Sequence, residues 1–103
     1  MNLRESARDQ ECLIRIPGAC LWLPEYSILS HYPGGAGGKG RSLKSLDICG
    51  AIGCTGCDAV IDRQVKPPPG MTYEDCLICW FEGHMRTLVF WKERAMVSYR
   101  GKR

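Results

Sequence analysis

The chain has 103 residues, of which 45% are hydrophobic and 24% are charged, and its formal net charge is +3. This composition is typical of a folded globular protein and excludes a disordered chain, and the length predicts one domain over residues 1–103. No apolar run has the length of a membrane span, and the charged N-terminus lacks the apolar core of a signal peptide. We therefore expect a cytoplasmic protein that does not bind membranes.

Seven cysteines are many for a chain of this length. In the reducing cytoplasm, clustered cysteines bind metal more often than they form disulfides. The chain also contains 12 glycines and 6 prolines, so much of it is expected to be loop around a small core. Small domains of this kind commonly need a bound metal or a disulfide to stay folded.

The first half of the chain predicts short elements. Residues 12–16 are apolar enough for a short strand, which the Pro17-Gly18 pair would end in a turn. Residues 26–30 predict a second short strand. The glycine-rich stretch 33–40 must be a loop, because glycine cannot hold regular structure cheaply. Residues 57–64 could form a short helix before a proline-rich spacer.

A long helix over residues 72–95 is the clearest element of the second half. Thr72 and Asp75 resemble a capping box, with aspartate in place of the usual glutamate or glutamine. Apolar residues and one histidine follow at spacings of three and four, which predicts one buried helix face. The residues on this predicted face are Leu77, Phe81, His84, Leu88, Trp91 and Ala95.

Two cysteine pairs indicate a structural zinc site. Zinc prefers four ligands in a tetrahedron, and the Cys54-x2-Cys57 knuckle supplies two of them, so Cys12 and Cys20 would supply the others. The alternative is a set of scattered buried thiols, and Cys49 is a possible substitute ligand. Cys76 and Cys79 have the same spacing as the knuckle, but they lie in the predicted helix and are better explained as buried thiols.

His31 precedes the glycine-rich loop and has two interpretations. It could act as a general base beside a divalent metal, or it could simply hydrogen-bond the backbone. The loop favours a function, because Lys39, Arg41 and Lys44 could bind the phosphates of DNA where glycines allow close approach. His84 lies on the apolar face of the long helix, so a satisfied core histidine is the better interpretation.

Asp58 and Asp62 stand four residues apart on the predicted short helix, so they share a face. Two carboxylates there could hold Mg²⁺ or Mn²⁺, which prefer oxygen ligands. The alternatives are ordinary solvated charges, or a helix-capping role for Asp58.

The chain resembles the YbcO family, small prophage-encoded proteins described as nucleases of the HNH (ββα-metal) type. The resemblance rests on residues 1–20, on the Cys54-x2-Cys57 knuckle with residues 60–63, and on residues 82–87. It implies an α+β fold in which a short β-hairpin and a helix grip a catalytic metal beside a structural zinc, with this zinc and ββα core over residues 12–64 and the long helix at the C-terminus.

The resemblance also assigns roles to single residues. His31 matches the family's base, and Asp58 stands where the family typically has a histidine that binds the catalytic metal. Ser30 stands where many HNH enzymes carry an acidic ligand, and the central asparagine of the HNH motif is missing. These departures bear on activity more than on the fold.

Two functions follow as expectations. The first is a phage or prophage DNA endonuclease with His31 and Asp58 as catalytic residues. The alternative is a non-catalytic, zinc-stabilised module that binds DNA or a phage recombination protein, which would need neither His31 nor a second metal. A dithiol redox protein is less favoured, because no thioredoxin-like βαβ pattern surrounds Cys54 and Cys57.

Overall fold

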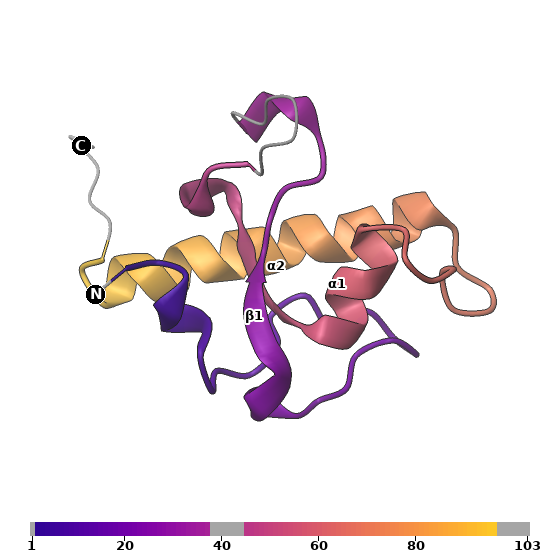
Figure 1. Cartoon of the computed structure of the whole chain (residues 1–103), viewed down its shortest axis with the longest axis horizontal. Helices are drawn as coiled ribbons and strands as arrows, with labels where there is room; N and C mark the ends of the chain where they lie inside the picture. The colour runs from indigo at the N-terminus through magenta and orange to yellow at the C-terminus, as the bar shows by residue number, and fades with distance from the viewer. Residues whose placement is uncertain (1, 38–44, 97–103) are drawn as a thin grey trace.

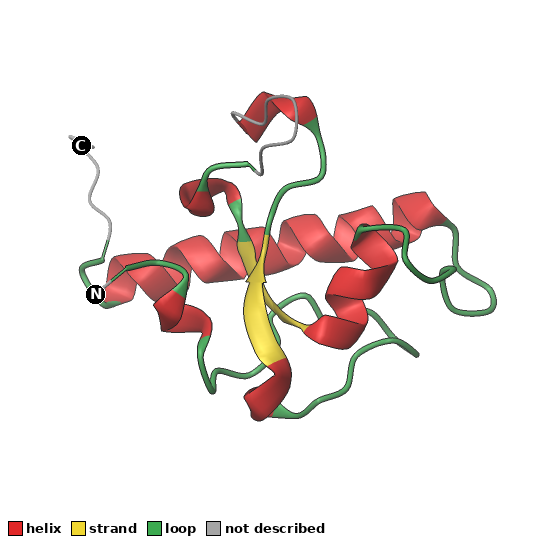
Figure 2. Ribbon diagram, viewed as in Figure 1, coloured by secondary structure: helices red, strands yellow, loops and turns green. Residues whose placement is uncertain are grey.

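The protein is described here by a computed structural model, which places residues 2–37 and 45–96. Two short strands lie across one long helix, a second helix lies beside them, and loops form most of the rest (Figures 1 and 2). The fold is thus a small α+β arrangement with a two-stranded sheet. Its main elements are the 3-10 helix η1 (Glu5–Ala7), strands β1 (Ser27–Ser30) and β2 (Ala51–Cys54), and helices α1 (Thr55–Ile61) and α2 (Tyr73–Glu93).

The sheet pairs β1 with β2 in antiparallel orientation, with Ser27 opposite Cys54 and Ser30 opposite Ala51. β2 runs directly into α1, so a strand, a strand and a helix follow one another along the chain. The connection between the strands covers residues 31–50 and includes a further 3-10 helix, η4 (Asp47–Cys49). The expected short hairpin is therefore an antiparallel pair joined by a long loop.

The strand predicted over residues 12–16 is wrong. Arg15 has a φ of +61°, a left-handed conformation that cannot continue an extended strand. One hydrogen bond, from Leu13 N–H to Ile52 O at 2.9 Å, attaches this segment to the outer edge of β2. The sequence suggested a strand because the segment is apolar, and Ile14 and Ile16 are indeed fully buried in the core.

The long helix is confirmed, and so is its capping box. Thr72 Oγ1 accepts a hydrogen bond from Asp75 N, and the Asp75 carboxylate accepts one from Thr72 N. These contacts satisfy two backbone N–H groups that a helix N-terminus otherwise leaves without partners. No helix in residues 2–37 and 45–96 combines the length and the apolar character that crossing a bilayer requires.

The predicted buried face of this helix is wrong by about one residue. Phe81 is 43% exposed, and Ala95 lies beyond the end of α2 and is exposed. Of the predicted face, Trp91 is fully buried. The residues that α2 buries are Cys76, Trp80, Gly83, Thr87 and Trp91.

Thr87 and Gly83 explain why α2 turns this face to the sheet. The Thr87 hydroxyl accepts a hydrogen bond from Ile52 N at 2.8 Å and donates one to Gly83 O at 2.7 Å. It thereby gives a partner to a β2 N–H that β1 does not reach. At Gly83 the missing side chain lets residues 13 and 14 approach the helix backbone. Gly83 and the Thr87 hydroxyl thus determine which face of α2 packs on the sheet, although neither is an apolar side chain that a hydrophobic pattern would reveal.

Candidate metal centre and histidine–carboxylate site

Four cysteines converge where β2 passes into α1. Cys54 ends β2, and Cys57 lies in the first turn of α1, where its N–H donates to the Cys54 sulfur. The turn around Pro17 and Gly18 brings Cys20 back towards Cys12, with Cys20 N bonded to Ile16 O at 2.9 Å. The four sulfur atoms all lie within 4.8 Å of one another.

The sulfur positions fit a tetrahedral zinc site. A Zn–S distance of about 2.3 Å in a tetrahedron separates neighbouring sulfurs by about 3.8 Å. The Cys12 and Cys57 sulfurs are 3.7 Å apart, and the Cys54 and Cys20 sulfurs are 3.9 Å apart. Thiolate is also the ligand type that zinc prefers in closed structural sites. The cluster could therefore hold a metal ion such as zinc.

Backbone N–H groups surround the sulfurs as they would surround thiolates. Cys12 Sγ accepts from Arg15 N and Cys54 N, and Cys57 Sγ accepts from Ile16 N, at 3.3–3.4 Å. The Cys57 thiol and these N–H donors lower the pKa of Cys12 to about 5, whereas burial raises the pKa of Cys20 to about 12. A bound divalent cation would displace the remaining thiol protons and offset the repulsion between thiolates.

The other three cysteines lie outside this cluster. Cys49 lies in η4, and its sulfur is not among the four that lie together, so it is not a substitute ligand here. Cys76 is fully buried and Cys79 half-buried on α2, as expected for thiols that pack in a helix. In residues 2–37 and 45–96, the four clustered cysteines form the only group of three or more metal-ligating side chains.

His31 forms a close pair with Asp47, a residue that the sequence analysis missed. His31 follows the end of β1, and its Nε2 lies 2.8 Å from Asp47 Oδ1. An ionised carboxylate can only accept a hydrogen bond, so Nε2 carries the hydrogen and Nδ1 of the neutral ring keeps its lone pair. The same Oδ1 accepts from Arg4 Nη2 at 3.3 Å. Nothing in the sequence links positions 31 and 47, because the long loop between the strands creates their contact.

The charges around Asp47 favour its ionised form. Its hydrogen bond from His31, followed in importance by that from Arg4, holds the pKa of the Asp47 carboxyl below its ordinary value of 3.8. The His31 side chain is only 13% exposed, whereas that of Asp47 is 34% exposed. The carboxylate is thus placed to orient a mostly enclosed imidazole.

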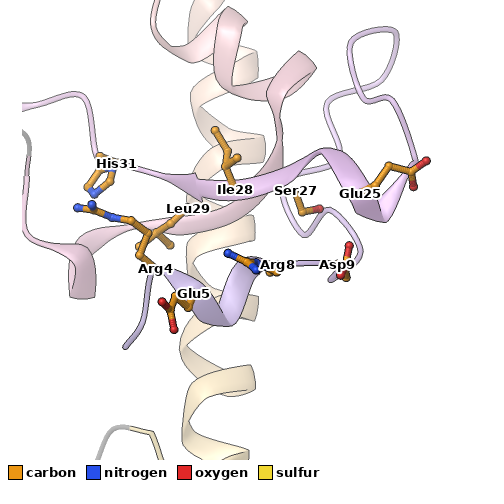
Figure 3. A pocket seen from close by; sticks show the side chains of 9 residues that line it. All are labelled: Arg4, Glu5, Arg8, Asp9, Glu25, Ser27, Ile28, Leu29 and His31. Carbon is orange, nitrogen blue, oxygen red and sulfur yellow. The ribbon is translucent and has the colours of Figure 1, made fainter. Parts of the chain in front are cut away.

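Asp58 lies in a different hydrogen-bonded group. Its Oδ1 accepts from Ser30 Oγ at 2.7 Å, and Ser30 Oγ in turn accepts from Trp80 Nε1 at 3.0 Å. Asp62 follows the last residue of α1 and is exposed, one turn from Asp58. Ser30 thus contacts α1 and α2 through these bonds. His31 pairs with Asp47 instead and lies beside Arg4 (Figure 3).

The remaining predicted residues have simpler positions. His84 Nδ1 donates to Gly50 O at 2.7 Å, and its ring stacks on Trp80 with the two planes 12° apart. This is the satisfied, half-buried histidine that the sequence predicts. The predicted phosphate-binding residues Lys39, Arg41 and Lys44 lie outside the residues that the structure describes.

Comparison with known proteins agrees over nearly the whole chain. The family model described as "Putative nuclease YbcO" matches residues 1–96. Two curated relatives of that name, from Escherichia coli K12 and from Enterobacteria phage 82, are each 34% identical over 97 residues, which is 94% of this chain and 97% of theirs.

A solved structure agrees as well. The chain described as "Structure of a putative bacteriophage protein from Escherichia coli str. K-12 substr. MG1655" superposes with a TM-score of 0.72 at 32% sequence identity. The match covers 91% of the present chain and all of the other. Sequence and fold therefore lead to one conclusion: this chain belongs to the YbcO family.

Proposed function

We propose that the protein is a DNA endonuclease of the HNH (ββα-metal) type, which hydrolyses phosphodiester bonds with His31 as general base. The observation that carries the proposal is the hydrogen bond from His31 Nε2 to Asp47 Oδ1. It holds the ring in the tautomer whose Nδ1 can take a proton. The nuclease name of the family and the order of β1, β2 and α1 along the chain also support it.

The proposed reaction is a displacement by water at phosphorus. His31 Nδ1 removes a proton from the water as its oxygen bonds to phosphorus, and the bond from phosphorus to the ester oxygen breaks. The leaving oxygen then takes a proton from solvent. Asp47 keeps the imidazole oriented and stabilises the positive charge that forms on it. General base catalysis of this kind contributes about 10²–10⁴-fold to a rate.

Asp58, with Asp62 one turn further on, is the candidate ligand set for Mg²⁺ or Mn²⁺. Ser30 engages one Asp58 oxygen, which leaves the other oxygen for a metal. Mg²⁺ usually keeps several waters and binds one or two carboxylates together with substrate phosphates, so a larger protein cage is not required. When bound, the ion would stabilise the charge that develops on the phosphate and on the leaving oxygen.

Plasmid nicking tests the proposed function. The wild type should nick supercoiled plasmid with Mg²⁺ or Mn²⁺ and stop when EDTA is added. His31→Ala should lose about a hundredfold or more of the rate while keeping its fold. His84→Gln is the matched control at the chain's other histidine, and we expect it to nick at nearly the wild-type rate. Undiminished nicking by purified His31→Ala would refute the role of His31.

A second candidate function is a non-catalytic, zinc-stabilised module that binds DNA or a phage recombination protein. The Ser30–Asp58 hydrogen bond favours it, because it joins two side chains that would otherwise be available to a metal. Asp58→His separates the two candidates by restoring an imidazole ligand. Increased nicking in this variant would support a weakened nuclease, and no nicking by either protein would support the binding module.

A further inference from the structure

A cleft of about 700 Å³ lies between η1 and β1 and ends at His31 (Figure 3). Arg4 and Arg8 line it from the side of η1, and Ser27 and Leu29 line it from β1. Because alternate residues of a strand face the same side, Ser27, Leu29 and His31 all face this cleft. The cleft therefore provides a direct approach to the proposed base.

The charges along the cleft are unevenly distributed. The Arg4 guanidinium lies beside His31, and the Arg8 guanidinium lies further along the same wall (Figure 3). Asp9 and Glu25 line the opposite end of the cleft, and the Glu5 carboxylate points away from β1 (Figure 3). Of the charged groups that line the cleft, the Arg4 guanidinium is therefore the one next to His31, and it pairs with Asp47.

Both arginines have donors to spare. Arg4 gives one hydrogen bond to Asp47 at 3.3 Å, although a guanidinium carries five N–H donors. The Arg8 side chain makes no hydrogen bond or ion pair with any residue in the described ranges. The Arg4 side chain is 66% exposed, so its pairing with Asp47 adds little to stability and leaves the group accessible.

We propose that Arg4 and Arg8 form a phosphate-binding site, which holds the backbone of a DNA strand in this cleft beside His31. The forked geometry of guanidinium suits the non-bridging oxygens of a phosphodiester. The contacts position the strand and carry no sequence information. The inference rests on the proposed nuclease function, and it adds a site that is separate from Lys39, Arg41 and Lys44.

Binding in the absence of cleavage tests the site. A short fluorescein-labelled DNA duplex is titrated with protein at several salt concentrations in buffer without Mg²⁺ or Mn²⁺, and fluorescence anisotropy gives the affinity. Arg4→Gln and Arg8→Gln should each weaken binding and reduce the salt slope by about one unit, because each removes one phosphate contact. Arg94→Gln is the matched control, since Arg94 stacks on Phe90 at the end of α2 and does not line the cleft.

Two results would overturn the phosphate site. One is wild-type affinity and slope in both cleft variants, and the other is an equal loss in Arg94→Gln, which would indicate attraction by net charge alone. His31→Ala should retain the wild-type slope, because it removes no phosphate contact. If nicking needs His31 but the arginine variants keep the wild-type salt slope, the proposed nuclease function is supported and the phosphate site is not. Reduced slopes without any nicking would support the site and count against the nuclease.

Discussion

Asp47 and His31 are joined by a 2.8 Å hydrogen bond across the long connection between β1 and β2. The bond brings a carboxylate from η4 to the residue that follows β1, so it ties the end of this loop to the sheet. Because Arg4 shares the same carboxylate oxygen, the N-terminal segment is attached at the same point.

The lowered pKa of Asp47 predicts a pH-dependent contribution to stability. The folded carboxyl binds its proton less readily than the unfolded one, so the contribution is fully present above the unfolded value near 3.8 and is lost as pH falls through the lower folded value. Asp47→Asn should therefore unfold more easily than the wild type near neutral pH, and the difference should close in acid. Urea unfolding of both proteins across this range measures the difference.

Asp9→Asn is the control for this prediction, because Asp9 pairs with no cation among the described residues. Loss of a metal in acid would affect all three proteins alike, so the differences between them isolate the aspartates. A gap between Asp47→Asn and the wild type that stayed constant with pH would contradict the linkage.

The four-cysteine cluster predicts about one zinc per chain in protein purified without added metal. Cys57→Ser should lose the zinc and lower the melting temperature, because a structural metal contributes its binding free energy to folding. Elemental analysis and calorimetry give the two quantities. Cys49→Ser is the matched control outside the cluster and should keep its zinc. Wild-type protein that contained no metal, and whose melting temperature did not change when zinc was added, would count against the site.

Ser30→Ala should destabilise the protein by about 1–3 kcal/mol, because it leaves the buried Trp80 N–H without its acceptor. Thermal unfolding should show a drop of about 4–8 °C for each kcal/mol. Trp80→Phe removes the donor instead. If the hydrogen bond is the cause, Ser30→Ala should cost less in the Trp80→Phe background than in the wild type. Equal costs in both backgrounds would assign the effect to the lost Ser30–Asp58 hydrogen bond or to lost packing.

Replacing Gly83 with alanine should destabilise the protein, although this change normally favours a helix. A Cβ there would lie 2.7 Å from Ile14 Cα and 2.9 Å from Leu13 O, both backbone atoms that cannot move aside easily. Gly83→Ala should therefore destabilise the protein by about 1–3 kcal/mol, although alanine favours an isolated helix by about 1 kcal/mol. Gly35→Ala, where a Cβ would meet nothing within 4 Å, should change stability little. A stabilised Gly83→Ala protein would contradict this packing.

The sequence predicted α2 and its cap well, because a capping box and a long periodic segment are local signals. It misplaced the buried face, since Leu, Phe and Val residues occur all around α2 and hydrophobicity alone cannot select one side. The choice depends on Gly83 and Thr87, which fit against residues 13–14 and β2. Such complementarity between distant segments leaves no trace in periodicity.

The candidate site, too, could be predicted from the sequence only in part. The four cysteines could be grouped from residue type and spacing, because few other arrangements suit so many thiols in a short chain. The partners of His31 and Asp58 could not be predicted. Asp47 reaches His31 only through the path of a long loop, and Ser30 reaches Asp58 only because α1 packs beside the sheet. The family resemblance singles out His31 and Asp58, whereas their pairing with Asp47 and Ser30 depends on tertiary structure.

The contacts of α2 with the N-terminal segment also constrain how the protein is made. Trp91 Nε1 donates to Ser6 Oγ, and Arg86 donates to Leu13 O, so segments that are synthesised well before the long helix pack against it. During translation, η1 and residues 12–16 must wait for α2 to leave the ribosome before they can be covered. During that interval the apolar Ile14 and Ile16 lack the helix that covers them in the folded protein, and transiently exposed apolar surface of this kind favours aggregation.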